Sequence, residues 1–359
     1  MESVFIIAEA GVNHNGDREK AFQLVDVAVE AGVDAVKFQT FKAENVVTEN
    51  AEKAAYQKKT TGNTESQFEM LKRLELPRET HHELKSYCKE KKIKFLSTAF
   101  DLESLDFLVN NLGLKTLKIP SGEITNGPLL LAYAQTECNL ILSTGMATLG
   151  EVEEALSVLA FGFLNSTNLK LKPSRVAFLE AFLSKTGQKV LKKKVSILHC
   201  TTEYPAPLRE INLNAMITMR NAFGLETGYS DHSEGIIVPT AAAAMGARII
   251  EKHFTLDKSL PGPDHKASLE CGELSEMVNA IRTVEQVMGN GVKVPALSEL
   301  KNRAVVRRSL VARTGIQRGD VISKEMVSIL RPCAGKSPME YWNVIGEKQL
   351  TTICKGEKF

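Results

Sequence analysis

The sequence predicts an α/β protein, a closed parallel (β/α)₈ TIM barrel followed by a small second domain. Eight short apolar runs alternate with stretches whose apolar residues recur at helical spacing. Eight such units suit a barrel, which takes roughly 250 of the chain's residues. A doubly wound sheet is the alternative, but the first run is followed by GVNHNG rather than the GxGxxG phosphate-binding pattern. The predicted strands are residues 4–9, 35–39, 94–98, 116–119, 140–144, 195–200, 227–230 and 248–253.

The chain of 359 residues divides into a barrel over residues 1–289, a linker over 290–303 and a small domain over 304–359. A long polar connection, residues 41–77, follows the second strand, and such connections at this end of a barrel are usually functional. A Lys- and Ser-rich insertion at about 161–194 is expected to be a solvated surface excursion. The small domain is near the lower size limit for independent stability, so we expect it to dock on another surface.

The composition excludes several classes of protein. Lys and Arg number 45 and Asp and Glu number 43, and this balance gives no support for a nucleic-acid partner. No apolar stretch approaches the roughly 18 residues that a membrane-spanning helix needs, and the first residues do not resemble a signal peptide. The six cysteines form no CxxC pair. We therefore expect reduced thiols in a cytoplasmic protein.

Polar side chains follow all eight predicted strands, where active sites of barrels form. His232 and His253 end the neighbouring seventh and eighth strands. Two neutral imidazoles on adjacent strand ends can share a divalent ion, and Glu9 could complete the site directly or through a water. The pattern favours Mn²⁺, with Mg²⁺ or Co²⁺ as alternatives, over a structural zinc. A lone histidine is more often structural, so the prediction depends on the pair.

Two lysines, Lys37 and Lys118, project from the second and fourth strands among several hydroxyl groups. Two ammonium groups with hydroxyls form a cradle for a phosphate and a carboxylate. The alternatives are that each lysine is simply solvated or ion-paired at the barrel rim, or that Lys118 forms a Schiff base in an aldolase that needs no metal. The hydroxyl residues on the same ring are Thr98, Ser121, Ser143 and Ser230.

Two further residues stand beside prolines at the barrel mouth. Asp264 lies in the rigid turn PGPDH, which would present its carboxylate, although it could be an ordinary turn residue. Tyr204 precedes Pro205 after the sixth strand, and it could bind a ligand or only pack at the rim.

The strand-end motifs taken together resemble the sialic acid (N-acetylneuraminate) synthase family, which includes bacterial legionaminic acid synthases. The resemblance covers nearly the whole chain, and its C-terminal part resembles the family's antifreeze-like (SAF) domain. The strings that carry it are FIIAEAGVNHNG (5–16), VKFQT (36–40), KIPSGE (118–123), LSTGM (142–146), HCTTEYP (199–205), GYSDH (228–232), EKHF (251–254), GPDH (262–265), RSLVA (308–312) and LRP (330–332).

The resemblance implies a role for each matching position. His232 and His253 would hold the metal, and Glu9 would lie beside a metal-bound water. Glu9, Lys37, Lys118 and Asp264 would form the catalytic set. Phosphoenolpyruvate would contact Lys37, Thr98, Lys118, Ser121, Ser143 and Ser230, and the amino sugar would contact Gln39, Asn63, Glu123, Tyr204, Asp264 and Arg331.

The resemblance also implies a reaction and an assembly. Phosphoenolpyruvate would condense with N-acetylmannosamine to give N-acetylneuraminate and phosphate. In the alternative, 2,4-diacetamido-2,4,6-trideoxymannose would give N,N'-diacetyllegionaminate. The residues that choose between these sugars are expected in the 41–77 segment and near Tyr204. Arg331 would reach the partner's barrel in a domain-swapped homodimer. An ice-binding role for residues 304–359 is a third possibility, which the Lys and Arg content of that segment argues against.

Overall fold

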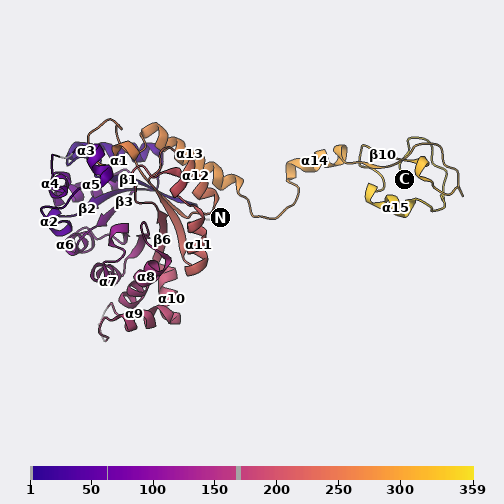
Figure 1. The fold of residues 1–359 in the computed structure, drawn as a ribbon. Coiled ribbons are helices and arrows are strands. Elements are labelled where there is room, and N and C mark those ends of the chain that lie inside the picture. The colour runs from indigo at the N-terminus through magenta and orange to yellow at the C-terminus, as the bar shows by residue number, and fades with distance from the viewer. Residues whose placement is uncertain (1–2, 63, 167–170) are drawn as a thin grey trace. The chain divides into compact units, whose positions relative to one another are not determined.

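Eight parallel strands close into a barrel, which confirms the predicted fold (Figure 1). The computed structural model describes residues 3–62, 64–166 and 171–359. No helix in those ranges is long and apolar enough to cross a membrane. Each strand pairs in parallel with the next, and β8 pairs with β1. The strands are β1 (Phe5–Gly11), β2 (Ala35–Thr40), β3 (Lys94–Ala99), β4 (Thr116–Ile119), β5 (Asn139–Ser143), β6 (Val195–Cys200), β7 (Glu226–Asp231) and β8 (Ile249–His253).

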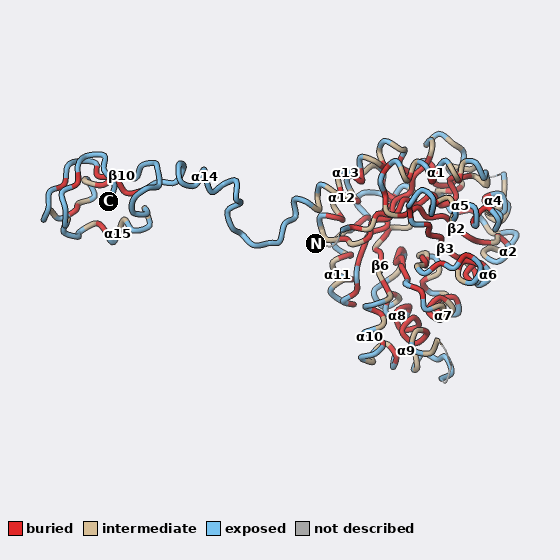
Figure 2. The backbone as a smooth tube through the Cα atoms, turned by 180° about the vertical axis from the view of Figure 1, so that it is seen from behind, coloured by how far each residue is buried: buried red, intermediate tan, exposed pale blue. Residues whose placement is uncertain are grey.

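Helices surround the barrel and bury their apolar faces against the strands, as the red core in Figure 2 shows. In α1, Asp17 accepts a hydrogen bond from the Lys20 backbone N–H at the start, and Gly32 ends the helix with φ of 75°. Its buried residues recur at helical spacing. The surrounding helices are α1 (Arg18–Ala31), α5 (Arg78–Glu90), α6 (Leu102–Asp106), α7 (Gly127–Gln135), α8 (Leu149–Leu164), α11 (Asn214–Phe223), α12 (Ile237–Ala244) and α13 (Cys271–Val287).

Strand alternation divides the barrel interior into an apolar floor and a polar layer above it. Val36 and Phe38 face outward into the main core, so Ala35 and Lys37 face inward. Six inward residues, one from each of six strands, form a separate apolar cluster. Two positions further along each strand, the inward residue lines a cavity. The floor comprises Ile7, Ala35, Leu96, Ile141, Leu198 and Ile249, and the cavity residues above them are Glu9, Lys37, Thr98, Ser143, Cys200 and Glu251.

The segment between β2 and β3 is more ordered and more apolar than predicted. It contains α2 (Ala43–Val46), α3 (Ala55–Thr61) and α4 (Gln67–Leu74) before α5 begins. Its apolar residues join Val12 and Phe100 in one cluster. The polar composition of the segment concealed this amphipathic pattern, because the apolar residues are dispersed among charged ones.

The insertion before β6 also differs from the prediction of a solvated excursion. It forms α9 (Arg175–Leu183) and α10 (Lys185–Lys194), both of which lie beside α8 in Figure 1. Phe178 packs edge-to-face on Phe161 of α8, with ring centroids 5.1 Å apart. The insertion therefore adds helices to the outer layer, although several of its apolar residues stay exposed.

The chain divides into two compact units, Met1–Gly289 and Asn290–Phe359. The second unit contains an antiparallel pair of strands and two small apolar clusters. The second half of the segment predicted as a linker, 290–303, is helical from Leu297 onward, because α14 extends over it. The elements of this unit are α14 (Leu297–Val306), β9 (Ser309–Ala312), β10 (Val327–Leu330) and α15 (Tyr341–Val344).

Candidate active site

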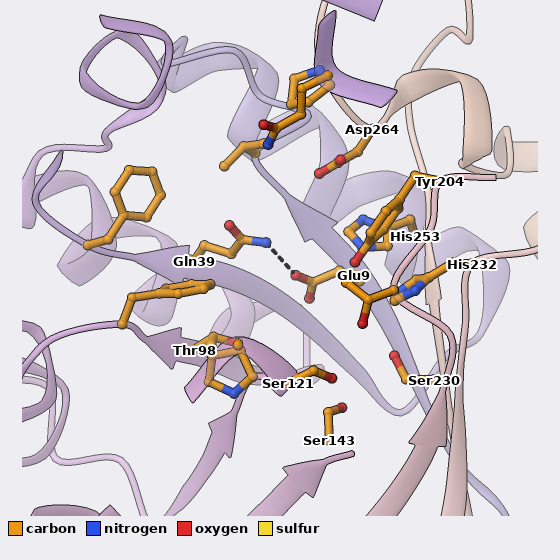
Figure 3. A pocket seen from close by; sticks show the side chains of 18 of the residues that line it. Glu9, Gln39, Thr98, Ser121, Ser143, Tyr204, Ser230, His232, His253 and Asp264 are labelled. Carbon is orange, nitrogen blue, oxygen red and sulfur yellow. Dashed lines mark hydrogen bonds between the residues drawn. The ribbon is translucent and has the colours of Figure 1, made fainter. Parts of the chain in front are cut away.

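A cavity of about 280 Å³ opens at the carboxyl ends of the barrel strands. Twelve of the fifteen residues predicted for the site line it, and Figure 3 shows ten of them. In that view, Ser121, Ser143 and Ser230 lie on one side of Glu9, and Asp264 lies on the other. The twelve are Glu9, Lys37, Gln39, Thr98, Lys118, Ser121, Ser143, Tyr204, Ser230, His232, His253 and Asp264.

Four buried charged groups belong to the polar layer of this cavity, directly above the apolar floor. Lys37 Nζ lies 2.7 Å from a Glu9 carboxylate oxygen and 3.6 Å from Glu251. Lys118 Nζ lies 2.6 Å from the other Glu251 oxygen. Because Glu251 faces both ammonium groups, it fixes the two lysines on one side of the cavity. The free barrel thus holds two cations side by side, as a doubly anionic ligand requires.

Burial shifts the proton equilibria of these groups. Burial, with Glu251 nearby and against the attraction of Lys37, raises the pKa of Glu9 to about 7. Burial also lowers the pKa of Lys118, although Glu251 acts in the opposite direction. For Glu251, burial favours the neutral form, but Lys118 and Lys37 outweigh it and hold the pKa below its ordinary value. At neutral pH, Glu251 is therefore the fixed anion, and Glu9 is the carboxylate that can exchange a proton.

The hydroxyl groups surround the lysines and leave acceptor and donor capacity facing the cavity. Lys37 Nζ donates to Thr98 Oγ1 at 2.9 Å, and Ser230 Oγ donates to Glu251 at 2.8 Å. Ser121 Oγ accepts from the Gly145 backbone N–H at 3.0 Å. Ser143 Oγ is buried without a hydrogen-bond partner among the described residues. A buried hydroxyl without a partner is costly, so this one is suited to a ligand.

Two histidines stand at the ends of β7 and β8, with ring centroids 5.6 Å apart. The Nδ1 atom of His232 lies 2.6 Å from the carbonyl of Thr201, so Nδ1 carries the hydrogen and Nε2 is free. Tyr204 stacks on His232 at 4.1 Å and meets His253 edge-on at 5.7 Å. The tyrosine therefore covers the histidine pair on the side of the cavity mouth.

The donor set at the two histidines fits a divalent ion. Burial lowers the pKa of His232 to about 4 and that of His253 well below its ordinary value, so both rings are neutral at pH 7. His253 Nδ1 is buried and has no hydrogen-bond partner within the described ranges. In those ranges no three His, Cys, Asp or Glu side chains form a metal-binding group. Glu9 is engaged by Lys37 and by Gln39 Nε2 at 3.3 Å, so two imidazoles would be the protein ligands.

Asp264 is a second carboxyl group that can exchange a proton near neutral pH. Burial raises its pKa to about 7. It lies in the turn after β8. Burial raises the pKa of Tyr56, and the nearby charge of Asp264 acts in the same direction. Tyr56 in turn packs on Tyr204, with ring centroids 4.9 Å apart. The carboxyl group therefore stands beside two aromatic rings at the mouth.

A separate ion pair lies on the outward faces of β7 and β8, behind the histidines. Lys252 Nζ lies 2.6 Å from Asp231 Oδ2, and both side chains are completely buried. Lys252 also donates to the backbone carbonyl of Ser233, whose N–H donates to Asp231 Oδ1 at 3.0 Å. Because each member is next in sequence to one histidine, this pair fixes the two strand ends that carry them.

In the described part of the barrel, one predicted site residue, Glu123, does not line the cavity. Glu123 lies in the 3₁₀ turn Ser121–Glu123 and accepts a hydrogen bond from Asn126 Nδ2 at 2.7 Å, directly before α7. That turn directs Glu123 to the start of the helix, whereas Ser121 reaches the cavity. Asn63 lies outside the described residues. Arg331 is exposed and belongs to the second unit.

Two features of the cavity wall were not predicted from the sequence. Glu251 stands two positions before His253, so strand alternation alone places both on the inward face. The apolar wall formed by residues of the 41–77 segment had a weaker signal, the helical spacing of Met70, Leu71 and Leu74.

Comparisons with known proteins agree on one family. The NeuB family matches residues 24–293, and the SAF domain matches residues 307–357. An N,N'-diacetyllegionaminic acid synthase from Campylobacter jejuni is 49% identical, covering 97% of this chain and 96% of that protein. The Legionella pneumophila protein of the same name is 47% identical, covering 98% and 92%. The crystal structure of N-acetylneuraminic acid synthetase from Leptospira borgpetersenii has a TM-score of 0.66 at 32% identity, covering 84% and 90%.

Proposed function

The chain belongs to the NeuB family, and we propose that it condenses phosphoenolpyruvate with 2,4-diacetamido-2,4,6-trideoxymannose to give N,N'-diacetyllegionaminate and phosphate. The observation that carries this proposal is near-half identity, along the whole chain, to two N,N'-diacetyllegionaminic acid synthases. The comparisons thus favour the alternative acceptor over N-acetylmannosamine, which the sequence analysis placed first. The two-lysine cavity supplies the site for the phosphate and carboxylate of phosphoenolpyruvate.

The charged residues of the polar layer explain how phosphoenolpyruvate would be held. Lys37 and Lys118 pair with its anionic groups, and the hydroxyls of Thr98 and Ser143 donate to their oxygens. Glu251 keeps both ammonium groups in place before the substrate arrives. Because these charges are already in position, the protein needs little rearrangement when negative charge develops on the departing phosphate.

The reaction needs one carbon–carbon bond and one molecule of water. The C3 carbon of phosphoenolpyruvate attacks the aldehyde carbon of the sugar, and the aldehyde oxygen takes up a proton and becomes a hydroxyl. Water adds to C2 and loses a proton, and the C2–O bond to phosphate then breaks. Glu9 and Asp264, each with a pKa near 7, are the groups that can give and take these protons.

The two neutral histidines suit a divalent ion, and we include Mn²⁺ in the proposal, with Mg²⁺ or Co²⁺ as substitutes. Bound there by His232 and His253, it would supply Lewis-acid polarisation of the aldehyde oxygen and a bound water. Tyr204 covers the pair and Asp231–Lys252 fixes the strands behind it. The chain's own contribution is thus to orient two imidazoles and to limit the access of solvent.

A domain-swapped homodimer is part of the same proposal, with Arg331 of one chain contacting the sugar in the partner's barrel. Its support is the SAF match at residues 307–357 and the exposed guanidinium at the end of β10. Mixing Arg331→Ala with Lys118→Met tests it. We expect each variant alone to be nearly inactive, and mixed dimers with one intact site should restore about a quarter of the activity. If mixing restores none, the exchanged site is wrong.

The acceptor assignment is tested by measuring phosphate release from phosphoenolpyruvate with each sugar. We expect kcat/KM at least 10-fold higher for the diacetamido sugar, because a hydrogen-bonding site discriminates such substituents well. A higher kcat/KM for N-acetylmannosamine would make the enzyme an N-acetylneuraminate synthase. Borohydride with pyruvate tests the aldolase alternative, and we expect no covalent adduct on Lys118.

A further inference from the structure

Seven apolar side chains form one cluster, and every member of it lines the cavity. Four are buried and three are half-buried, and the cluster is distinct from both the barrel floor and the main core. A cluster that only supported the fold would not need all its members at the cavity surface. The seven are Val12, Phe41, Met70 and Leu74, with the half-buried Val46, Leu71 and Phe100.

The cluster begins where the polar layer ends. Phe41 and Phe100 each stand two positions beyond an inward polar residue, Gln39 and Thr98. The two aromatic rings meet edge-to-face, with centroids 6.0 Å apart. The inward surface therefore changes along the chain. Lys37 belongs to the proposed phosphate site, Gln39 follows as a polar residue, and Phe41 begins the apolar wall.

Two short helices carry the rest of this wall and are held together. Ser66 caps the start of α4 and forms a capping box with Glu69. A Glu75 carboxylate oxygen accepts from the Ala43 backbone N–H at 2.8 Å, joining the end of α4 to the start of α2. The wall is therefore preformed, since its helices are tied to each other independently of a ligand.

Polar groups beside the wall are largely engaged with one another. Gln57 Oε1 accepts from the Ala54 backbone N–H at 2.9 Å, and Gln67 Nε2 approaches the same atom at 3.5 Å. The Lys53 ammonium donates to Thr61 Oγ1 at 2.9 Å and lies 3.6 Å from Glu65. A hydroxyl group placed against Val46 and Leu71 would lose water without gaining a protein partner.

We infer that this apolar wall holds the C6 methyl group of the acceptor and selects a 6-deoxy sugar over its 6-hydroxy counterpart. The inference rests on the proposed function, because the aldehyde end must lie at the lysines and histidines. The other end of the sugar chain then extends toward the cavity mouth. Leu71, Val46 and Phe100 retain exposed surface there, and a methyl group would cover it.

Four acceptors separate this inference from the proposed function. They are 2,4-diacetamido-2,4,6-trideoxymannose, its 6-hydroxy counterpart, N-acetylmannosamine and 6-deoxy-N-acetylmannosamine. The two comparisons that differ only at C6 test the wall, and the two that differ only at C4 test the proposed acceptor. We expect the enzyme to prefer the 6-deoxy member of each C6 pair by about 10-fold or more in kcat/KM.

Two substitutions in the wall should remove that preference. Leu71→Asn and Val46→Thr place a polar group against C6, and Val46→Thr keeps the size of the side chain. We expect the C6 preference to fall to about 3-fold or less, through a loss of kcat/KM for the 6-deoxy sugars. Leu131→Asn is the matched control, since Leu131 is also a half-buried helical leucine but lies away from this cavity.

The inference is overturned if the wild-type enzyme shows no C6 preference in either pair. It is also overturned if both wall variants melt at the wild-type temperature and keep the full preference. If the C6 preference is present but the 4-acetamido group gives no advantage, the wall stands and the proposed acceptor fails. If Leu131→Asn also lost the C6 preference, the loss would come from destabilisation of the barrel and not from the wall, and the inference would be contradicted.

Discussion

Two buried charge clusters lie on opposite faces of the barrel wall and share strand β8, and they differ in which polar atoms they leave without a partner. Inside the barrel, Glu9, Lys37, Lys118 and Glu251 surround a cavity. On the outer face of β7 and β8, Asp231 and Lys252 are completely buried.

The inner cluster and the outer pair both combine lysines with carboxylates, but they serve different purposes. The outer charges are satisfied by each other and by the backbone of Ser233. The inner cluster keeps Glu251 Oε2 and Ser143 Oγ without a hydrogen-bond partner among the described residues. Glu251 and Lys252 are adjacent in sequence, so strand alternation places their side chains on opposite faces. Glu251 faces the cavity, and Lys252 faces the outer layer, where it stabilises the fold. Substitutions should therefore affect activity on one face and stability on the other.

The largest expected effect is the loss of activity in Lys118→Met. Removing one of two cations that stabilise the charge on the departing phosphate should lower kcat/KM by about 10³-fold. The free energy of unfolding should change by less than about 2 kcal/mol, because the cavity admits water and Lys37 still faces Glu251. Steady-state kinetics and urea unfolding of the same preparation measure both. Retention of more than a tenth of the activity would contradict the assignment.

The next effect is on stability, in Lys252→Met. This substitution leaves Asp231 buried and unpaired, which should lower the free energy of unfolding of the barrel unit by about 3–5 kcal/mol. The matched control is Lys258→Met, which removes a half-exposed partner of Glu273 and should cost less than about 1 kcal/mol. Urea unfolding compares the two variants. Equal costs would show that Asp231–Lys252 is no more structural than a surface pair.

The smallest effect is a pH dependence at Asp264. Burial raises the pKa of this carboxyl group to about 7, so the folded chain retains a proton that the unfolded chain loses near pH 4. Stability from this group is therefore present at low pH and falls as the pH rises from about 4 to 7. Asp264→Asn should reduce this pH-dependent loss in the free energy of unfolding by about 1–3 kcal/mol. Unfolding at a series of pH values measures it, and identical slopes for both proteins would contradict the raised pKa.

The sequence predicted the barrel and most of the cavity because strand ends carry a strong signal. Polar residues after apolar runs identified Lys37, Lys118 and both histidines. It did not identify Glu251, which looked like one more residue of a polar strand end until alternation separated it from Lys252. It placed Glu123 in the site, although a 3₁₀ turn directs that side chain to Asn126.

The remaining differences arise where tertiary contacts decide the structure. The apolar wall comes from residues scattered through a polar segment and is formed only when α2, α4 and β2 meet. The helices α9 and α10 depend in the same way on the packing of Phe178 against α8. The composition of such segments is mostly polar, but their few apolar residues make the tertiary contacts, and these residues are too dispersed to give a clear pattern in the sequence.

The most direct test of the proposed condensation follows the bridging oxygen of phosphoenolpyruvate, labelled with ¹⁸O between C2 and phosphorus. Product and phosphate are analysed by mass spectrometry after reaction with the diacetamido sugar. Attack of C3 on the aldehyde and of water on C2 predicts that the label leaves with phosphate. Label retained in the sugar acid would mean that the P–O bond breaks, and it would contradict the mechanism assigned to this cavity.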